Sequence, residues 1–221
     1  MKHIVKILST KQVTHDVKCF RFEKPEGYHF NPGQATDVSI NQKGLEEELR
    51  PFTFTALNDE PYLEFTIKRY PDHHGITDKL HQLNPGDEII IHDVWGAIEY
   101  KGPGYFIAGG AGVTPFIAIL RDLHKQHKID GNILFFSNKT ADDIIYKDEL
   151  KTMLRENAVF LLTKENKAGY RNERIDKKFI EKNITDFNKH FYVCGPDEMI
   201  KDITKNLEDA GAKADAVVFE K

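Results

Sequence analysis

Cysteine is scarce in this sequence: only two of its 221 residues, Cys19 and Cys194, carry a thiol, and they lie far apart along the chain. Two thiols cannot supply the four ligands of an all-cysteine iron–sulfur cluster or of a Cys₄ zinc site. Two cysteines also cannot form the several disulfides of a disulfide framework, so we expect a cytoplasmic protein. His124 and His127 stand three positions apart in a predicted helix without evident carboxylate partners, so we expect no metal site.

Long apolar runs and an excess of positive charge are also missing. No run approaches the about 18–20 apolar residues of a membrane helix, and residues 1–12 lack the apolar stretch and cleavage site of a signal peptide. The 31 basic and 35 acidic residues give a net charge of -4, whereas nucleic-acid binding leaves a basic footprint. We therefore expect neither a membrane span nor a nucleic-acid partner. With 40% hydrophobic residues, the chain can form a packed core.

Residues 1–100 are predicted to form an antiparallel β-barrel or sandwich. Short runs rich in β-branched and aromatic residues alternate with turn residues such as Pro25 with Gly27, and this spacing is typical of such folds. One helical segment, 76–83, has apolar residues at helix-like spacing. The predicted strands cover residues 4–8, 17–22, 37–40, 51–57, 63–70 and 88–92.

Beyond residues 100–103 the pattern changes to strands that alternate with helices, which is typical of βαβ units and a parallel sheet. We therefore predict two domains, an antiparallel β-barrel over 1–100 and a Rossmann-like parallel α/β domain over 101–221. Open α/β sheets bind nucleotides at the carboxyl ends of their strands. The strands are predicted at 105–108, 132–136, 159–163 and 191–194, and the helices at 115–125, 148–156 and 197–210.

A glycine-rich turn, GGAGVTP at 109–115, follows the first strand of the α/β domain. Glycine lets a backbone turn sharply and approach a pyrophosphate. Thr114 is expected to cap the next helix and Pro115 to be its first residue, so that N–H groups would face phosphate oxygens. A tight strand-to-helix turn that binds no ligand explains the same residues, and the motif alone does not decide between the two.

Three shorter motifs are each compatible with a binding role and with a structural one. RPFTF at 50–54 combines an arginine, a ring and a hydroxyl, which suits a phosphorylated planar ligand but also an ordinary strand. GITDKL at 75–80 fits an anion site or a capped helix. Taken singly, these two are better explained structurally. YVCGPDEM at 192–199 places a cysteine where α/β ligands bind, although buried cysteines are commonly inert.

Together, the four motifs resemble the ferredoxin–NADP reductase superfamily of flavoproteins. They occur in the order and at the distances seen in that family, over nearly the whole chain, and FNPGQ at 30–34 looks like its barrel signature. The compact flavodoxin and ferredoxin reductases and the reductase modules of oxygenase systems are the most similar members. The resemblance implies FAD as the cofactor of the N-terminal domain and NADH or NADPH as the substrate of the C-terminal domain.

The resemblance also implies which residues hold the flavin. Arg50 would bind a phosphate, Phe52 would stack on the isoalloxazine where most members have tyrosine, and Thr53 would hydrogen-bond N5, the atom that receives hydride. Further flavin contacts are implied for Pro51, Lys68, Arg69 and Tyr70, and backbone contacts to the pyrophosphate for Gly75, Ile76 and Thr77.

On the nucleotide side, the resemblance implies that Cys194 lies near the carbon that transfers hydride, so that Thr53 and Cys194 are the candidate catalytic residues. Phe219 is the candidate flavin cover, or alternatively a core residue at a strand end. Glu220 follows it in the reverse of the usual order, which leaves its role open. The dinucleotide would contact Gly110, Gly112, Val113, Thr114, Gly195 and Pro196.

The implied function is hydride transfer from NAD(P)H to FAD, followed by electron transfer to flavodoxin, ferredoxin or an oxygenase component. Two alternatives stay open: a free-flavin or quinone reductase, and a non-catalytic subunit of the same fold that senses nucleotide or binds a partner. Nucleotide preference is also open. Residues 137–140 (SNKT) offer no acid for a ribose 2′-hydroxyl, and Lys139 with Lys164 or Arg171 makes no clear 2′-phosphate cluster.

Overall fold

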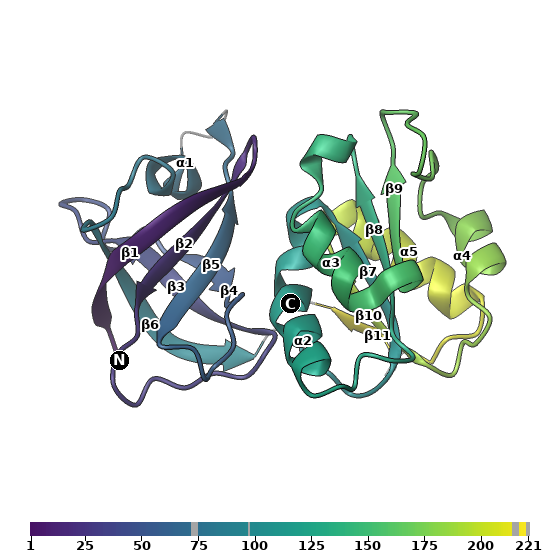
Figure 1. Ribbon diagram of the computed structural model, residues 1–221, viewed down its shortest axis with the longest axis horizontal. Coiled ribbons are helices and arrows are strands. Elements are labelled where there is room, and N and C mark those ends of the chain that lie inside the picture. Colours follow the sequence, from purple (N-terminus) through teal and green to yellow (C-terminus); the bar gives the residue numbers. More distant parts are fainter. Residues whose placement is uncertain (72–74, 97, 214–216, 220–221) are drawn as a thin grey trace. The chain divides into compact units, whose positions relative to one another are not determined.

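The computed structural model describes residues 1–71, 75–96, 98–213 and 217–219. Two compact units divide the chain, Met1–Ala97 and Ile98–Lys221. In the first unit antiparallel strands predominate, and in the second parallel strands alternate with helices (Figure 1). Each unit has a hydrophobic core of its own.

The first unit is an antiparallel β-barrel. Its six described strands lie in the order β4-β3-β6-β1-β2-β5, and an antiparallel bridge between Phe54 and Phe65 joins the two outer strands. Beside this bridge, the Thr55 N–H donates to the Glu64 carbonyl at 2.9 Å. Closure leaves fewer unpaired backbone groups at the sheet edges. The elements are β1 (His3–Thr14), β2 (Val17–Glu23), β3 (Gln34–Ile40), β4 (Arg50–Thr53), β5 (Tyr62–Lys68), α1 (Ile76–Leu80) and β6 (Glu88–Gly96).

Strand β5 shows how the sequence places the barrel core. Leu63, Phe65 and Ile67 occupy alternate positions and belong to the core, because successive side chains of a strand point to opposite faces. The ring centroids of Phe54 and Phe65 are 5.1 Å apart, and those of Phe30 and Phe54 are 4.1 Å apart in a stacked pair. These three rings are part of the barrel core.

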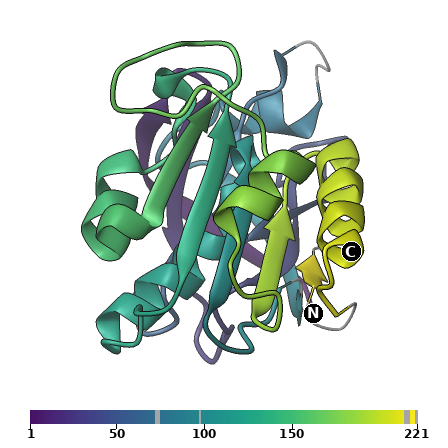
Figure 2. The ribbon, with the colours of Figure 1, turned by 90° about the vertical axis from the view of Figure 1, so that its right-hand side faces the viewer.

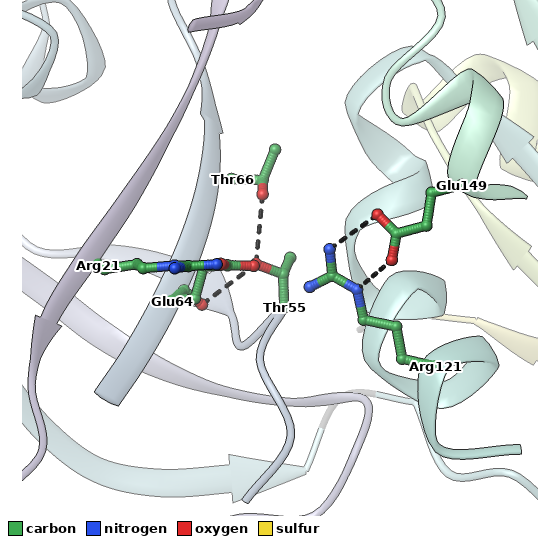
Figure 3. A network of polar contacts seen from close by, with 6 residues as sticks. All are labelled: Arg21, Thr55, Glu64, Thr66, Arg121 and Glu149. Atoms are coloured by element: carbon green, nitrogen blue, oxygen red, sulfur yellow. Dashed lines mark hydrogen bonds and ion pairs between the residues drawn. The ribbon is translucent and has the colours of Figure 1, made fainter. Parts of the chain in front are cut away.

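The residues between these core positions carry a buried polar network (Figure 3). Glu64 is 2% exposed, and its carboxylate accepts hydrogen bonds from Arg21 Nε and Thr55 Oγ1, each at 3.0 Å. Thr55 Oγ1 lies 3.2 Å from Thr66 Oγ1. A buried carboxylate is tolerated only when it is paired and hydrogen-bonded, and this network meets that requirement.

The second unit is a parallel sheet with helices on both faces. Its described strands lie in the order β11-β10-β7-β8-β9. Helices α2 and α3 lie on one face and α4 and α5 on the other (Figures 1 and 2). The elements are β7 (Gly104–Gly109), the 3₁₀ turn η2 (Gly110–Val113), α2 (Thr114–Lys125), β8 (Ile133–Asn138), the 3₁₀ turn η3 (Ala141–Asp143), α3 (Lys147–Leu154), the 3₁₀ turn η4 (Arg155–Asn157), β9 (Ala158–Leu162), α4 (Lys177–Asn183), β10 (His190–Cys194), α5 (Asp197–Asp209) and β11 (Val217–Phe219).

The segment that leads into β7 is fixed to this sheet by one hydroxyl group. Tyr192 Oη accepts hydrogen bonds from the N–H groups of Lys101 and Gly102 at 2.9 and 3.0 Å, and it donates to the Gly102 carbonyl at 2.8 Å. Burial raises the pKa of the Tyr192 phenol, so the hydroxyl keeps its proton and can donate. The ring of Tyr100 stacks beside Tyr192 with the centroids 5.7 Å apart.

The predicted fold class is confirmed, but some details differ. Helix α4 was not predicted, because its sequence KKFIEKN buries only Phe179 and Ile180. Its start is fixed by Asp176, whose carboxylate accepts the Phe179 N–H at 2.9 Å. The expectation that Thr114 caps α2 is wrong. The turn η2 already coils before it, so Thr114, rather than the expected Pro115, is the first residue of α2. The Thr114 hydroxyl donates to the Ala111 carbonyl at 3.0 Å.

Folding of the first unit should depend on pH through His81, which ends α1. His81 Nε2 lies 2.8 Å from the Ile67 carbonyl, and burial lowers the pKa of this imidazole below its usual 6.5. A lowered folded-state pKa means that the unfolded chain binds the proton more tightly. The stability is therefore present above pH 6.5 and decreases as the pH falls toward the folded-state value.

We expect denaturant unfolding of wild type at pH 7.5 and 5.5 to show this loss, with up to about one proton taken up per molecule. His81→Gln should make the pH dependence shallower. His124→Gln, which removes an exposed histidine of α2, should leave the pH dependence as it is. An equally steep dependence in His81→Gln would contradict the assignment.

Candidate functional site

Strand β4 carries the RPFT motif at the rim of the barrel. Arg50 and Pro51 are exposed, Phe52 is half-buried with its ring centroid 6.2 Å from that of Phe65, and Thr53 is buried. The Arg50 guanidinium donates to the neighbouring Leu49 carbonyl at 2.7 Å and forms no ion pair with any residue that the structure describes. An exposed arginine without a carboxylate partner suits an anionic ligand.

Two further segments converge on this end of the barrel. β4 and β5 run antiparallel from the Phe54–Phe65 bridge, so Arg50 and Arg69 lie toward the same end of the two strands. Lys79 of α1 pairs with Glu48, just before β4, at 3.6 Å. The structure therefore brings together the three segments that hold the predicted flavin residues 50–53, 68–70 and 75–77.

Lys68 and Arg69 are engaged by acidic side chains. Lys68 Nζ lies 2.9 Å from Asp16 Oδ2, and Arg69 Nε lies 2.6 Å from Asp78 Oδ1. Burial alone would raise the pKa of Asp16, but the hydrogen bond and charge of Lys68, together with smaller effects of Thr14 and His15, outweigh it, so this pKa is lowered. These pairs fix the end of β5 to α1 and to the β1–β2 turn. Tyr70 remains 44% exposed.

The start of α1 supplies the remaining predicted flavin residues. Gly75 is the N-cap residue, and its carbonyl accepts the N–H groups of Asp78 and Lys79 at 3.1 and 3.2 Å. Ile76 is buried in the barrel core, whereas Thr77 is half-buried. Ile76 thus anchors the start of α1 in the barrel core. Sequence reasoning missed Asp16 and Asp78, because their partners are recognisable only in the fold.

In the second unit, two glycine-containing loops meet at the carboxyl edge of the sheet. Ala108 of β7 pairs with Cys194 of β10, so the loops that follow these strands are neighbours. A Cβ on Gly112 would lie 2.4 Å from the Cys194 carbonyl oxygen, and a Cβ on Gly195 would lie 3.2 Å from the Gly109 nitrogen. At Gly112 only glycine permits this backbone-to-backbone approach, and at Gly195 a Cβ would make a tight contact.

Of the two loops that follow β7 and β10, the first has free space beside Gly110. Gly110 has φ +54, and apart from its immediate neighbours in the chain no described atom lies within 4 Å of a Cβ built on it. This left-handed turn next to free space is the arrangement that lets a backbone approach a pyrophosphate. On either side, Val113 and Cys194 are buried, and the exposed Pro196 is the N-cap residue of α5.

Sequence reasoning missed two residues of this edge. Met199 Sδ would lie 2.4 Å from a Cβ on Gly109 and 3.1 Å from one on Gly195, so the thioether packs beneath both loops. Asn138, the last residue of β8, is 5% exposed, and neither atom of its amide has a hydrogen-bond partner in the described structure. A buried amide without partners at a ligand-binding edge fits a polar ligand such as a nucleotide.

Helices α2 and α3, which cover one face of this sheet, are joined by a bidentate salt bridge (Figure 3). Arg121 donates from Nε and Nη2 to the two carboxylate oxygens of Glu149 at 2.6 and 3.0 Å. The guanidinium also lies 5.1 Å from the centroid of the Tyr146 ring. This pairing holds α3 against the helix that follows the glycine-rich turn.

The C-terminal predictions concern β11 and the residue after it. Phe219 is the last residue of β11, and its backbone pairs with Val193 of β10. Glu220 lies outside the described residues. Neither cysteine forms a disulfide, and both are buried. Among the described helices, none combines the length and the hydropathy needed to span a membrane.

Two family models together match most of the chain. An oxidoreductase FAD-binding domain covers residues 4–100, and an oxidoreductase NAD-binding domain covers residues 106–205. The first match lies on the barrel and the second on the parallel sheet with its two glycine-containing loops.

Curated relatives and solved structures agree with these matches. The reductase component of propane 2-monooxygenase from Rhodococcus jostii is 26% identical over 98% of this chain, and NADH-cytochrome b5 reductase 2 from Mycosarcoma maydis is 26% identical over 93% of it. The chain spans 62% and 65% of the lengths of these two relatives. A flavohem-like FAD/NAD-binding domain of a Vibrio cholerae nitric oxide dioxygenase has the same fold, with a TM-score of 0.87, 19% identity and coverage of 98% and 97% of the two chains.

Proposed function

Because the chain belongs to the ferredoxin–NADP reductase superfamily, we propose that it transfers hydride from NADH or NADPH to bound FAD and delivers electrons to a separate redox protein. The observation that carries the proposal is the contact between the loops after β7 and β10, with Gly112 against the Cys194 carbonyl and Gly110 open at the surface. This arrangement forms a cradle for a dinucleotide at the edge where such ligands bind.

In the first unit, each residue of the RPFT motif has a distinct role in the proposal. Arg50 binds a phosphate of FAD with its exposed guanidinium, and Phe52 presents a half-buried ring for stacking. Thr53 is 6% exposed, and its hydroxyl would form the hydrogen bond to flavin N5. Gly75, Ile76 and Thr77 offer backbone N–H groups to the pyrophosphate, while Lys68, Arg69 and Tyr70 border the ring system.

In the second unit, the backbone of Gly110, Gly112, Val113 and Thr114 holds the pyrophosphate of the nicotinamide dinucleotide. Cys194, Gly195 and Pro196 form the wall that positions the nicotinamide. FAD supplies, when bound, a two-electron acceptor that can release its electrons singly. In this proposal the protein acts by binding and orienting the nicotinamide and the flavin ring system, and acid–base chemistry is not required.

The proposed electron acceptor is an oxygenase component or a small carrier such as ferredoxin or flavodoxin. Two of the relatives support an oxygenase partner, since one is named as the reductase component of propane 2-monooxygenase and another as the reductase subunit of glycine betaine monooxygenase. Electron-transfer contacts are small and transient, so the acceptor leaves little trace in the residues of the reductase.

The test is a visible spectrum of the purified full chain, followed by parallel anaerobic titrations with NADH and NADPH. We expect a yellow protein whose flavin absorption is lost on adding at least one of the two nucleotides. A protein that takes up no flavin on reconstitution would contradict the proposal and point to a non-catalytic subunit. Loose flavin binding with rapid turnover of added free flavin would instead identify a free-flavin reductase.

A further inference from the structure

Two carboxylates occupy the backbone donors where the chain leaves β8. The Thr140 N–H donates to Asp143 Oδ2 at 2.7 Å, and the Thr140 hydroxyl donates to the same oxygen at 2.8 Å. The next N–H along the chain, that of Ala141, donates to Glu165 Oε2 at 2.7 Å. Glu165 follows β9, the strand beside β8, so residues from two neighbouring strand ends meet here.

This position matters for the proposed dinucleotide site. β8 is the strand that follows the glycine-rich turn and α2, and it pairs with β7. In dinucleotide-binding α/β folds, the end of this strand lies at the adenosine ribose. A ribose 2′-hydroxyl donates well to a carboxylate, whereas a 2′-phosphate needs N–H donors or an arginine.

The donors that a 2′-phosphate would need are already used. The N–H groups of Thr140 and Ala141 each hold a carboxylate oxygen, and these negative charges repel a phosphate. Nearby, the buried amide of Asn138 offers one donor and one acceptor group without net charge, and both lack partners in the described structure. A neutral ribose with hydroxyl groups fits such a surface better than a phosphorylated one.

The basic residues of this region do not compensate. Arg171 is committed elsewhere, because it pairs with Glu173 and donates to Asn183 Oδ1 at 2.9 Å. Lys139 and Lys164 are exposed and adjacent, since the Lys164 N–H donates to the Lys139 carbonyl at 2.9 Å. A lysine ammonium is a hydrated charge on a flexible side chain, and it lacks the planar guanidinium with which arginine binds a phosphate bidentately.

From this arrangement we propose that the second unit selects NADH over NADPH, with Glu165 as the main specificity-determining residue and Asp143 as the second. The inference rests on the proposed function, because it assumes that the carboxyl edge of this sheet holds a nicotinamide dinucleotide. It extends that function by specifying NADH as the preferred nucleotide and the carboxylates of Glu165 and Asp143 as the groups that determine the preference. Glu165 Oε2 is held by the Ala141 N–H, so Oε1, 3.7 Å from Lys167 Nζ, is left to accept a ribose hydroxyl.

The test measures binding without redox chemistry. ADP-ribose and its 2′-phosphorylated form carry the adenosine end of NADH and NADPH but no nicotinamide, and calorimetry on the full chain reports their affinities. We expect wild type to bind ADP-ribose at least about tenfold more tightly, the effect of one unit charge at a partly exposed site. Glu165→Gln keeps an acceptor for the Ala141 N–H and removes the charge, so it should bring the two affinities to within about threefold.

Glu181→Gln is the matched control, because it removes one carboxylate from α4 of the same unit, where Glu181 faces Lys177 at 4.0 Å. It should leave the wild-type ratio unchanged. Asp143→Asn is a second variant, which should shift the ratio in the same direction as Glu165→Gln. The ratio of kcat/KM for NADH over NADPH should follow the binding ratio in each variant.

The outcomes separate this inference from the proposed function. If wild type binds the 2′-phosphorylated form as tightly as ADP-ribose, the selection is overturned while a dinucleotide site stands. If Glu165→Gln leaves the preference intact, the role of Glu165 is overturned. If neither compound binds, the nucleotide site itself fails, and the proposed function fails together with this inference.

Discussion

Gly112→Ala is expected to disrupt both the stability of the second unit and its nucleotide site. The new Cβ would lie 2.4 Å from the Cys194 carbonyl oxygen and 2.5 Å from the Gly195 nitrogen. Both are backbone atoms at the end of a central strand, so they cannot turn aside as a flexible side chain would. Overpacking of this kind costs about 1–3 kcal/mol, and a displacement of about 1 Å can lower turnover about 100-fold.

Thermal unfolding together with kcat/KM for the preferred nucleotide measures this effect. Gly110→Ala is the matched comparison, because a Cβ there meets no described atom within 4 Å, although φ is +54. A left-handed alanine costs about 1–2 kcal/mol but displaces no neighbouring strand. We expect Gly110→Ala to weaken nucleotide binding with a smaller loss of Tm. Equal losses of Tm in the two variants would show that the contact with Cys194 is not what requires glycine.

Thr53→Ala is expected to leave FAD bound and to slow flavin reduction by about 10–100-fold. Thr53 is buried at the end of β4, and the proposal gives its hydroxyl the hydrogen bond to flavin N5. Removing it leaves the phosphate contact of Arg50 in place. Stopped-flow absorbance under anaerobic conditions measures the reduction rate, and the ratio of flavin to protein absorbance measures occupancy.

The control for this variant is Thr53→Ser, which removes the methyl group but keeps the hydroxyl. It should reduce flavin at close to the wild-type rate. If Thr53→Ala and Thr53→Ser slow the reaction equally, packing at this position rather than the hydroxyl is responsible. An unchanged rate in Thr53→Ala would remove Thr53 from the proposed catalytic residues.

Local patterns were enough to predict the two kinds of sheet. In β5, the run of β-branched and aromatic residues between turn residues predicted the strand, and the structure places its alternate residues Leu63, Phe65 and Ile67 in the core. In the second unit, the alternation of apolar strands with helices predicted the parallel sheet. These features depend on near neighbours in the sequence, so a single chain contains the information needed to find them.

Features that depend on distant partners could not be predicted in the same way. Glu64 is an acidic residue in a strand, and only the fold brings Arg21 and Thr55 to it. Likewise, residues 137–140 contain no acidic residue, and the carboxylate that binds the Ala141 N–H comes from Glu165, in the segment after β9. Thr114 was misassigned as a cap because its sequence context resembles one, whereas the coil of η2 before it moved the start of the helix.

The three hydrogen bonds of the Tyr192 hydroxyl have a practical consequence for dissecting this protein. The N–H groups of Lys101 and Gly102 donate two of these bonds, and the Gly102 carbonyl accepts the third. Both residues precede β7 in the parallel sheet. A recombinant fragment cut at Gly104 would lack them and would leave a buried phenol without protein partners, which costs about 1–3 kcal/mol. A recombinant nucleotide-binding unit should therefore begin before Tyr100, so that the fragment contains Lys101 and Gly102 and keeps the hydrogen bonds of the Tyr192 hydroxyl.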